Sequence, residues 1–245
     1  MRTQMLCFAF VCLMASGCGD NTMTAATLDL AQAAALPDLT VPTTSAQGVI
    51  TDDGATIAPL MGAMVCPYPS HTPCVSTDAT GMFNLSGLPL SGAAFTIEKA
   101  GFYTGLWTFP PSTGAPYAIS PQLVATSGDR YLTASGKTQD SSKGFITVFV
   151  HDGNGAQLTG ATLALSPSAG DGPIYFDATV TPPKVLTSTG HGFIFFMNVP
   201  AASYTVTATA AGKTCNSTLG VLSGANAATV PVVAGDRTAI GFVCQ

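Results

Sequence analysis

The stretch Thr77–Leu85, TDATGMFNL, decides the fold of this 245-residue chain. Its first part holds Asp78 and Gly81, and both residue types favour turns, since glycine takes a positive φ without a steric penalty. Its second part is a short apolar run whose alternate side chains point to opposite faces, so we expect Phe83 to face a core. A turn followed at once by a short strand is typical of all-β domains.

The same unit recurs on both sides of this stretch. Turn signals return about every ten residues with short apolar runs between them, which is typical of an all-β sandwich or barrel. The recurring pieces are GVIT before the turn DDG (Asp52–Gly54), MGAMV (Met61–Val65), and GLP (Gly87–Pro89) before AFTIE (Ala94–Glu98).

The second half of the chain repeats this order. LTGA at Leu158–Ala161 matches LMGA at Leu60–Ala63, and Phe193 takes the place of Phe83. The spacing is roughly 100 residues, which marks a domain duplication, because solenoid repeats run about 20–50 residues. We therefore expect two tandem β-sandwiches, at 47–126 and 144–245, joined by a polar linker at 127–143.

Inward-facing positions of the predicted strands should form one core in each half. The expected core residues are Val49, Phe83 and Phe95 in the first half and Val148, Val150, Phe193 and Val206 in the second.

The order of these motifs resembles the carboxypeptidase regulatory-like domain, a β-sandwich of transthyretin-like (prealbumin-like) type. The resemblance covers Gly48–Tyr103, which ends on the motif GFY, and extends more loosely over Gly144–Gly212, where the aspartate of the TDxxGxF motif is missing. It implies a fold in which the glycines and Asp78 form turns and the Phe and Leu residues fill the core. It brings no catalytic residue, because this domain is the accessory part of its enzymes.

Collagen-adhesin B-type pilin domains are a similar class of sandwich, and they form Lys–Asn isopeptide bonds. Lys143 lies near the start of the second predicted domain, but the last strand, Ile240–Val243, holds no asparagine. The first domain has no lysine before Lys99. We do not expect such a bond in this chain.

The first residues predict an export signal. The apolar run Leu6–Ala15 follows Arg2 and is too short for the ~20 residues that span a bilayer, which suits a signal peptide at 1–17. The sequence ASGC, ending at Cys18, resembles the lipobox of bacterial lipoproteins, although its usual leucine is replaced by Ala15. We expect Cys18 to be acylated and to anchor the protein to the outer membrane or cell surface. If Cys18 is not acylated, the protein is secreted.

The composition of residues 18–46 predicts a flexible Ala/Thr/Pro tether. The alternative is a disordered leader without a function. No later apolar run reaches the ~18 residues of a transmembrane helix.

The number of cysteines agrees with acylation of Cys18. Of the seven cysteines, two lie in the predicted signal peptide, and acylation of Cys18 leaves an even set of four. In an oxidising compartment an even set suggests disulfides, and their spacing does not fit a zinc site. The short separation favours Cys66–Cys74, which leaves Cys215–Cys244.

Composition excludes several classes of partner and chemistry. Charged residues make up 9% of the chain and the net charge is −5, which argues against nucleic acid as a partner. Glu98 is the only glutamate, so a pair of glutamates for acid–base catalysis is impossible. The chain also lacks the HExxH, GxSxG and phosphate-loop motifs. We expect a protein that is not an enzyme and needs no cofactor.

Two weaker possibilities concern metals and loop chemistry. His151 and His191 would have to meet to bind a metal, and with His71 they are the only histidines for a loop-based hydrolase. Asp52, Asp53 and Asp78 at one end of the first sandwich would offer oxygen ligands for Ca²⁺. Aspartate before glycine is the standard turn residue, so we favour turns over calcium.

Aromatic residues supply the binding candidates. Tyr103, Trp107 and Tyr117 lie close together in the first half, and a row of aromatic rings stacks on sugars or on a partner's side chains. We therefore expect a non-catalytic envelope protein that binds or scaffolds a protein or carbohydrate ligand. A purely structural spacer without a ligand is the alternative.

Overall fold

The computed structural model describes residues 42–54, 57–177, 180, 183–186, 190–191, 193–224 and 226–245. The predicted signal peptide, Cys18 and most of the predicted tether lie outside these residues. Among the described residues, no helix has the length and apolar character needed to cross a membrane.

The chain is almost all β, as predicted. The strands of the first half are β1 (Thr43–Val49), β2 (Thr51–Asp52), β3 (Met64–Pro67), β4 (Val75–Ser76), β5 (Met82–Pro89), β6 (Ala93–Glu98), β7 (Gly105–Phe109), β8 (Tyr117–Ile119) and β9 (Gln122–Leu123). They form one sheet in the order β5-β1-β8, a second run in the order β4-β3-β6-β7, and the small pair β2-β9.

The second half begins after the helix α1 (Arg130–Ser135). Its strands are β10 (Gly144–Asp152), β11 (Thr159–Ser166), β12 (Asp171–Asp177), β13 (Lys184–Leu186), β14 (Gly190–His191), β15 (Phe193–Val199), β16 (Ala202–Thr209), β17 (Cys215–Leu219), β18 (Val221–Gly224), β19 (Ala227–Val232) and β20 (Arg237–Cys244). One sheet runs β14-β11-β16-β19-β18, and the other contains β13-β12-β15-β10-β20, with β17 also paired to β20.

The two halves share one topology, which confirms the internal repeat. In the first half β1 pairs antiparallel with β5 and parallel with β8, and in the second half β10 pairs antiparallel with β15 and parallel with β20. The antiparallel run β4-β3-β6-β7 likewise corresponds to β14-β11-β16-β19. A loop hydrogen bond is also repeated. The amide of Leu60 donates to the carbonyl of Ile50, and the amide of Leu158 donates to the carbonyl of Val150, each at 2.9 Å.

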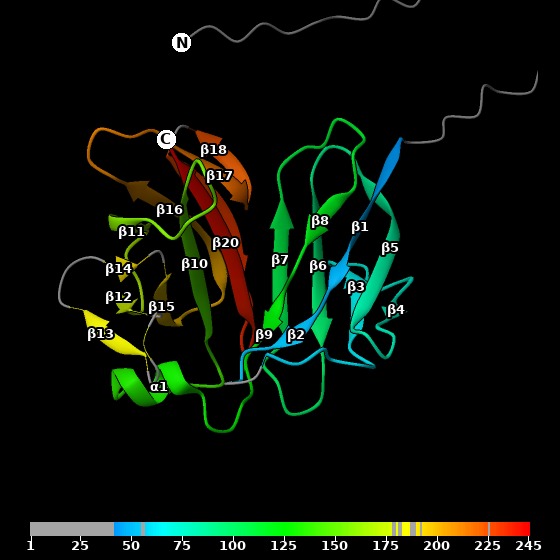
Figure 1. Cartoon of the computed structure of the whole chain (residues 1–245), viewed down its shortest axis with the longest axis horizontal. Coiled ribbons are helices and arrows are strands. Elements are labelled where there is room, and N and C mark those ends of the chain that lie inside the picture. Colours follow the sequence, from blue (N-terminus) through cyan, green and yellow to red (C-terminus); the bar gives the residue numbers. More distant parts are fainter. Residues whose placement is uncertain are drawn as a thin grey trace, which may run out of the picture. The chain divides into compact units, whose positions relative to one another are not determined.

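The two sandwiches are joined by a shared sheet. Strand β7 of the first pairs in parallel with β20 of the second, from Gly105 opposite Arg237 to Trp107 opposite Ala239. The result is a single ten-stranded sheet that belongs to both sandwiches (Figure 1). Residues Val41–Gln245 accordingly form one compact unit.

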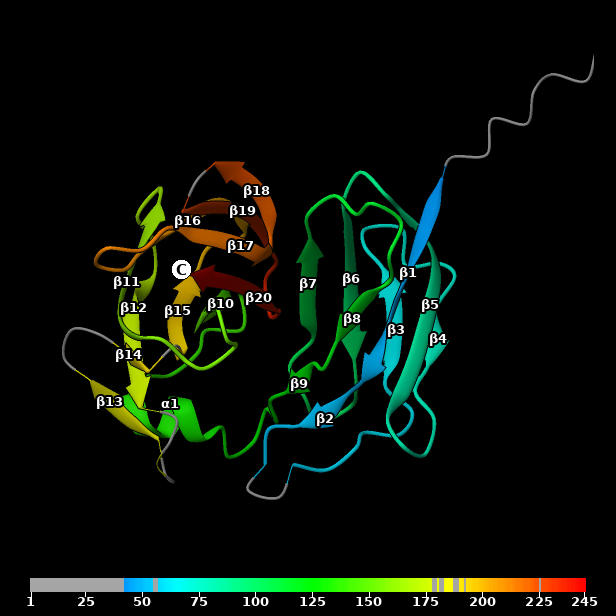
Figure 2. The same ribbon diagram turned by 45° about the horizontal axis from the view of Figure 1, so that its top comes forward.

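Strand β15 is buried on both of its faces. Ile194 and Phe196 face the core of the second sandwich, whereas Phe193 and Phe195 belong to a separate aromatic cluster on the other face. Tyr131 of α1 covers that cluster, and its ring centroid lies 4.7 Å from that of Phe193 and 5.1 Å from that of Phe195. Helix α1 lies beside the second sandwich in both ribbon views (Figure 2). This explains the nearly continuous apolar sequence of β15, which is unusual for an antiparallel sandwich strand.

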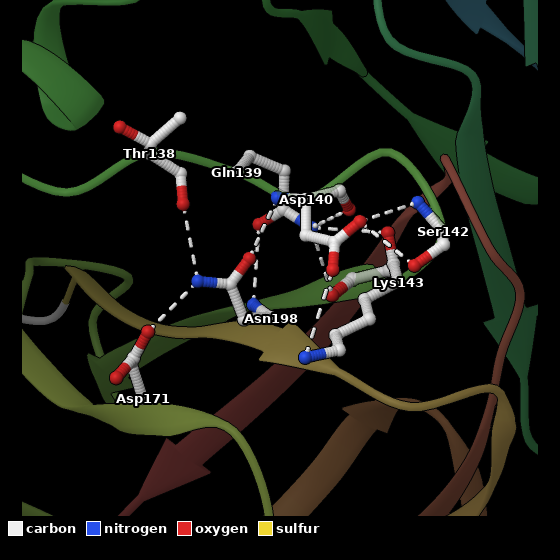
Figure 3. A network of polar contacts seen from close by, with 8 residues as sticks. Thr138, Gln139, Asp140, Ser142, Lys143, Asp171 and Asn198 are labelled. Carbon is white, nitrogen blue, oxygen red and sulfur yellow. Dashed lines mark hydrogen bonds and ion pairs between the residues drawn. The ribbon is translucent and has the colours of Figure 1, made fainter.

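The predicted linker at 127–143 is not a free spacer. It contains α1, whose N-cap is Asp129 and whose C-cap is Gly136 in the left-handed conformation. Beyond the helix, Asn198 binds the segment in place: its side-chain oxygen accepts from the amide of Asp140 at 2.7 Å, and its side-chain nitrogen donates to the carbonyl of Thr138 at 3.1 Å (Figure 3). The same nitrogen donates to Asp171 at 2.8 Å, and Lys137 Nζ of the segment lies 3.4 Å from the other carboxylate oxygen of Asp171, so the segment contacts two strands of the second sandwich.

Two further expectations need adjustment. Thr43–Ala46, assigned to the tether, belong to β1. Val49 is only half-buried and Ile50 is buried in its place, because Thr44 and Ala46 set the inward phase of the strand. The other expected core residues, Phe83, Phe95, Val148, Val150, Phe193 and Val206, are buried.

Both expected disulfides are present. Cys66–Cys74 closes the loop between β3 and β4, and Cys215–Cys244 joins β17 to β20. Each lies within one sandwich. A disulfide stabilises a small domain by ~2–4 kcal/mol, mainly by restricting the unfolded chain.

Candidate functional site

The aromatic binding candidates do not form a row. Trp107 is only 8% exposed, and its ring stacks on Phe149 of the second sandwich with a centroid distance of 6.5 Å. The expectation that Trp107 is a surface platform is therefore wrong, because the second sandwich covers it. Tyr103 is half-buried with its ring against Phe145, and the hydroxyl of half-buried Tyr117 donates to the carbonyl of Pro110. A binding role for these two tyrosines stays a prediction.

The histidines and loop aspartates are the residues that the sequence offers as metal ligands and as catalytic residues. His71 Nδ1 is 3.8 Å from Glu98 Oε1, and the side chain of His191 lies outside the described residues. Asp78 Oδ1 accepts from the backbone and hydroxyl of Thr80 and from the amide of Met82, and these bonds lower the pKa of Asp78, the Thr80 hydroxyl contributing most. Asp78 thus has the turn role that we favoured. Among the described side chains, no group of three or more His, Cys, Asp and Glu is arranged to hold a metal ion.

A cavity of about 450 Å³ lies where the first sandwich meets the segment before α1. Its volume falls in the range of about 300–1,000 Å³ that is usual for small-molecule sites. The described residues that line it are Asp52, Asp53, Gly54, Phe102, Val124, Ala125, Ser127, Gly128, Asp129 and Arg130. They combine an apolar floor with three carboxylates and one guanidinium.

Asp53 and Arg130 form the central ion pair of this wall. Arg130 Nη2 lies 2.6 Å from Asp53 Oδ1, and the Asp53 side chain is 7% exposed. Burial raises the pKa of Asp53 above its ordinary value, against the opposing charges of Arg237 and Arg130. The Arg130 guanidinium also donates to the hydroxyl of Tyr131 at 3.0 Å, and burial raises the pKa of Tyr131 to about 12.

Arg237 extends this charged cluster into the second sandwich. It lies at the start of β20 and is 8% exposed, and its Nε donates to Thr147 Oγ1 at 2.6 Å. Its guanidinium carbon lies 5.0 Å from the ring centroid of Phe195. Burial lowers the pKa of Arg237, whereas the charges of Asp53 and Asp129 oppose that change. The cluster therefore connects a loop of the first sandwich, α1 and the strand that joins the sandwiches.

Several buried atoms in the cluster have no hydrogen-bond partner among the described residues. They are Asp53 Oδ2, Asp129 Oδ2, Arg130 Nε and Arg237 Nη1. Asp129 is 5% exposed, and its other oxygen accepts from the amides of Tyr131 and Leu132. An unpaired buried polar group costs about 1–3 kcal/mol, so a bound group that donates to these carboxylates would be stabilised.

Sequence reasoning missed three of these four residues. Only Asp53 was singled out, as a calcium candidate. The available signal was a repeated tripeptide, because Gly-Asp-Arg occurs at 128–130 and again at 235–237 and contains the only arginines after Arg2. In a chain with 9% charged residues, two copies of a doubly charged tripeptide indicate a dedicated site.

Asp236, in the second tripeptide, should make the stability of the protein depend on pH. Burial, with the charge of Glu98 adding and that of His71 opposing, raises its pKa from 3.8 to about 6. Between these values the folded protein holds a proton that the unfolded chain releases, so the free energy of unfolding falls as pH rises through this window. Asp236→Asn should flatten this fall and make the protein more stable at pH 7, by less than about 1 kcal/mol because the group is partly exposed.

Urea titrations from pH 4 to pH 7 measure this effect. Asp140→Asn is the control of opposite sign, because a hydrogen bond from the Ser142 hydroxyl is the main cause that lowers the pKa of Asp140. That variant should be less stable at pH 7. A wild type whose stability rises from pH 4 to pH 6 in the same way as Asp236→Asn would contradict the prediction.

No protein-family model and no curated protein sequence matches this chain. Solved structures match it at low identity. The Bacillus anthracis TIE protein is 14% identical with a TM-score of 0.29, over 83% of this chain and 34% of that one, so this chain spans about a third of its length. GBS52, the minor pilin of Streptococcus agalactiae, is 11% identical with a TM-score of 0.27, over 82% and 95% of the two chains. The shaft pilin SpaA of Lactobacillus rhamnosus GG is 13% identical with a TM-score of 0.25, over 83% and 98%.

Proposed function

We propose that this protein is a non-catalytic, lipid-anchored protein of the bacterial envelope that binds a ligand where its first sandwich meets the segment before α1. The observation that carries the proposal is the cavity beside Asp53, Asp129 and Arg130. Its walls are built from the first sandwich and from residues 127–130, which lead into α1, and its carboxylates keep unused acceptor oxygens.

The same cavity favours binding over catalysis. No histidine is among the described residues that line it, so a hydrolase built on loop histidines has no support at this place. All four cysteines of the described residues are in disulfides, which leaves none of them as a nucleophile. The alternative of a loop-based hydrolase would have to use His71, or His151 with His191, at a place other than this cavity.

The lipid anchor rests on the sequence and has a direct test. Cells that express the full chain are grown with a palmitate analogue, and label on the protein is measured for the wild type and for Cys18→Ser. We expect the label to be lost completely in Cys18→Ser, because this cysteine alone follows the lipobox-like residues.

Cys12→Ser is the matched control, because Cys12 lies within the predicted signal peptide and is removed with it. It should keep the label at the wild-type level. Unlabelled wild-type protein would overturn the anchor and make this a secreted protein with a free Cys18.

A structural spacer is the second candidate, and one observation favours it. The pairing of β7 with β20 makes one sheet of both sandwiches, which suits a rigid support. The two candidates differ in binding. Fluorescently labelled protein that is retained on isolated envelopes in a saturable way, and is displaced by unlabelled protein, supports a binding protein. A spacer shows no saturable retention.

A further inference from the structure

We propose that the cavity beside Asp53 binds a primary ammonium group, supplied by a small amine or by the lysine side chain of a partner. This inference rests on the proposed binding function and names its ligand chemistry.

The formal charge of the cavity wall favours a cation. The described lining contains the carboxylates of Asp52, Asp53 and Asp129 and the guanidinium of Arg130, and the nearby charge of Arg237 acts on Asp53 as well, which leaves minus one when all are ionised. The Arg130 charge is already paired with Asp53 at 2.6 Å. A positive ligand would therefore meet an excess of negative charge at close range, where the surrounding protein screens it less than water does.

The unused hydrogen-bonding atoms of the wall point to a donor. Asp53 Oδ2 and Asp129 Oδ2 are acceptors without partners, and an ammonium carries three donors and no acceptor. Asp53 and Asp129 are both more than nine-tenths buried, at 7% exposure of the side chain and 5% of the residue. Phe102 adds an aromatic ring to the lining, and the faces of aromatic rings attract cations.

The repeat shows that Asp53 is not needed for the turn in which it lies. Asp52 and Asp152 are equivalent, because the amide of each donates to a loop alanine, Ala58 at 2.9 Å and Ala156 at 2.8 Å. Both carboxylates also accept from these alanines' amides, at 2.8 and 2.9 Å. The alanine follows Asp52 by six residues and Asp152 by four, and the residue after Asp152 is Gly153, so the shorter corresponding turn forms without a second carboxylate. Asp53 is thus an addition to the first sandwich, placed beside the cavity.

A metal ion and a sugar fit the wall less well. Among the described residues no metal-holding group of His, Cys, Asp and Glu exists, the cavity carboxylates included. A sugar hydroxyl can pair with the two unused acceptors and with the donor Arg130 Nε, but it carries no positive charge to meet the excess of carboxylates in the lining.

Calorimetric titration of the full chain tests the inference. The probes are n-butylammonium chloride and the blocked peptide acetyl-Gly-Lys-Gly-amide, with glucose and acetyl-Gly-Gln-Gly-amide as uncharged comparisons. We expect saturable binding of at least one ammonium probe and none of the uncharged ones. Binding of both ammonium probes shows that a free amine suffices, and binding of the peptide alone assigns the ammonium to a partner's lysine.

Two variants should weaken this binding at least tenfold. Asp53→Asn removes the charge and keeps an oxygen for the bond from Arg130. Ser127→Lys leaves that ion pair untouched and fills the cavity with an ammonium of its own, since Ser127 is an exposed lining residue.

The matched controls are Asp152→Asn, at the equivalent turn, and Ser91→Lys, at an exposed position that does not line the cavity. Each should bind within twofold of the wild type. Glucose binding without ammonium binding, no saturable binding of either ammonium probe by the folded protein, or equal loss in the controls would overturn the inference. Saturable retention on envelopes together with any of these results would leave the proposed function standing.

Discussion

Arg237→Ala is expected to lower the free energy of unfolding by about 3–5 kcal/mol, the range for breaking a buried charge cluster. Arg237 is 8% exposed, and its side chain bonds Thr147 at 2.6 Å and lies over the rings of Phe145 and Phe195. Its removal takes the compensating charge from Asp53 and Asp129 and opens a space between the sandwiches. Urea unfolding followed by tryptophan fluorescence measures the change, because Trp107 lies at this junction.

Lys137→Ala is the control for this experiment. Lys137 Nζ lies 3.4 Å from Asp171 Oδ1, but both side chains are over a third exposed, so the loss should stay below about 1 kcal/mol. Arg237→Met separates charge from volume, because methionine fills much of the space. A loss below 1 kcal/mol for both Arg237 variants would show that the cluster does not hold the sandwiches together.

Phe195→Ala should lower the free energy of unfolding by about 3–5 kcal/mol, as large-to-small changes at buried aromatic positions do. Phe195 is 1% exposed, and its ring lies within 5.1 Å, centroid to centroid, of the rings of Tyr131, Phe176 and Phe193. Every one of these rings belongs to the cluster between β15 and α1. The same urea titration measures the loss.

Phe196→Ala is the paired comparison, because Phe196 is the next residue on β15 and faces the opposite core. In an ordinary sandwich only one of two neighbouring strand residues is buried, so the two variants would differ sharply. Here both are 1% exposed, and we expect losses of similar size. A negligible loss for Phe195→Ala alone would mean that α1 does not cover this face.

How far the sequence predicts this molecule can be judged from particular residues. The repeated LxGA motif and the matching Phe83 and Phe193 located both sandwiches, because turn and strand preferences are local. Both disulfide pairs also followed from the even number of cysteines and the short separation of Cys66 from Cys74. Trp107 was misjudged because its cover comes from Phe149 of the other sandwich, and no local pattern reports a contact between distant segments.

Helix α1 and the charged cluster were not predicted from the sequence, and the reasons differ. The helix is only six residues long, so it shows no helical period, although Asp129 and Gly136 are favourable caps. The cluster depends on the pairing of β7 with β20, which brings Arg237 close to Asp53 and Asp129. Pairing between strands so far apart in the chain is set by the whole fold and not by the residues around Arg237.

The shared sheet also bears on the order in which the chain is made. Strand β7 is synthesised well before its partner β20, so during synthesis the edge of β7 stays without this neighbour until β20 has been made. An uncovered strand edge pairs readily with other chains, and the delay exposes the first sandwich to this risk until the second is complete. The edge of β7 is thus covered only after β20 has been made, so the first sandwich gains its last neighbour from the second.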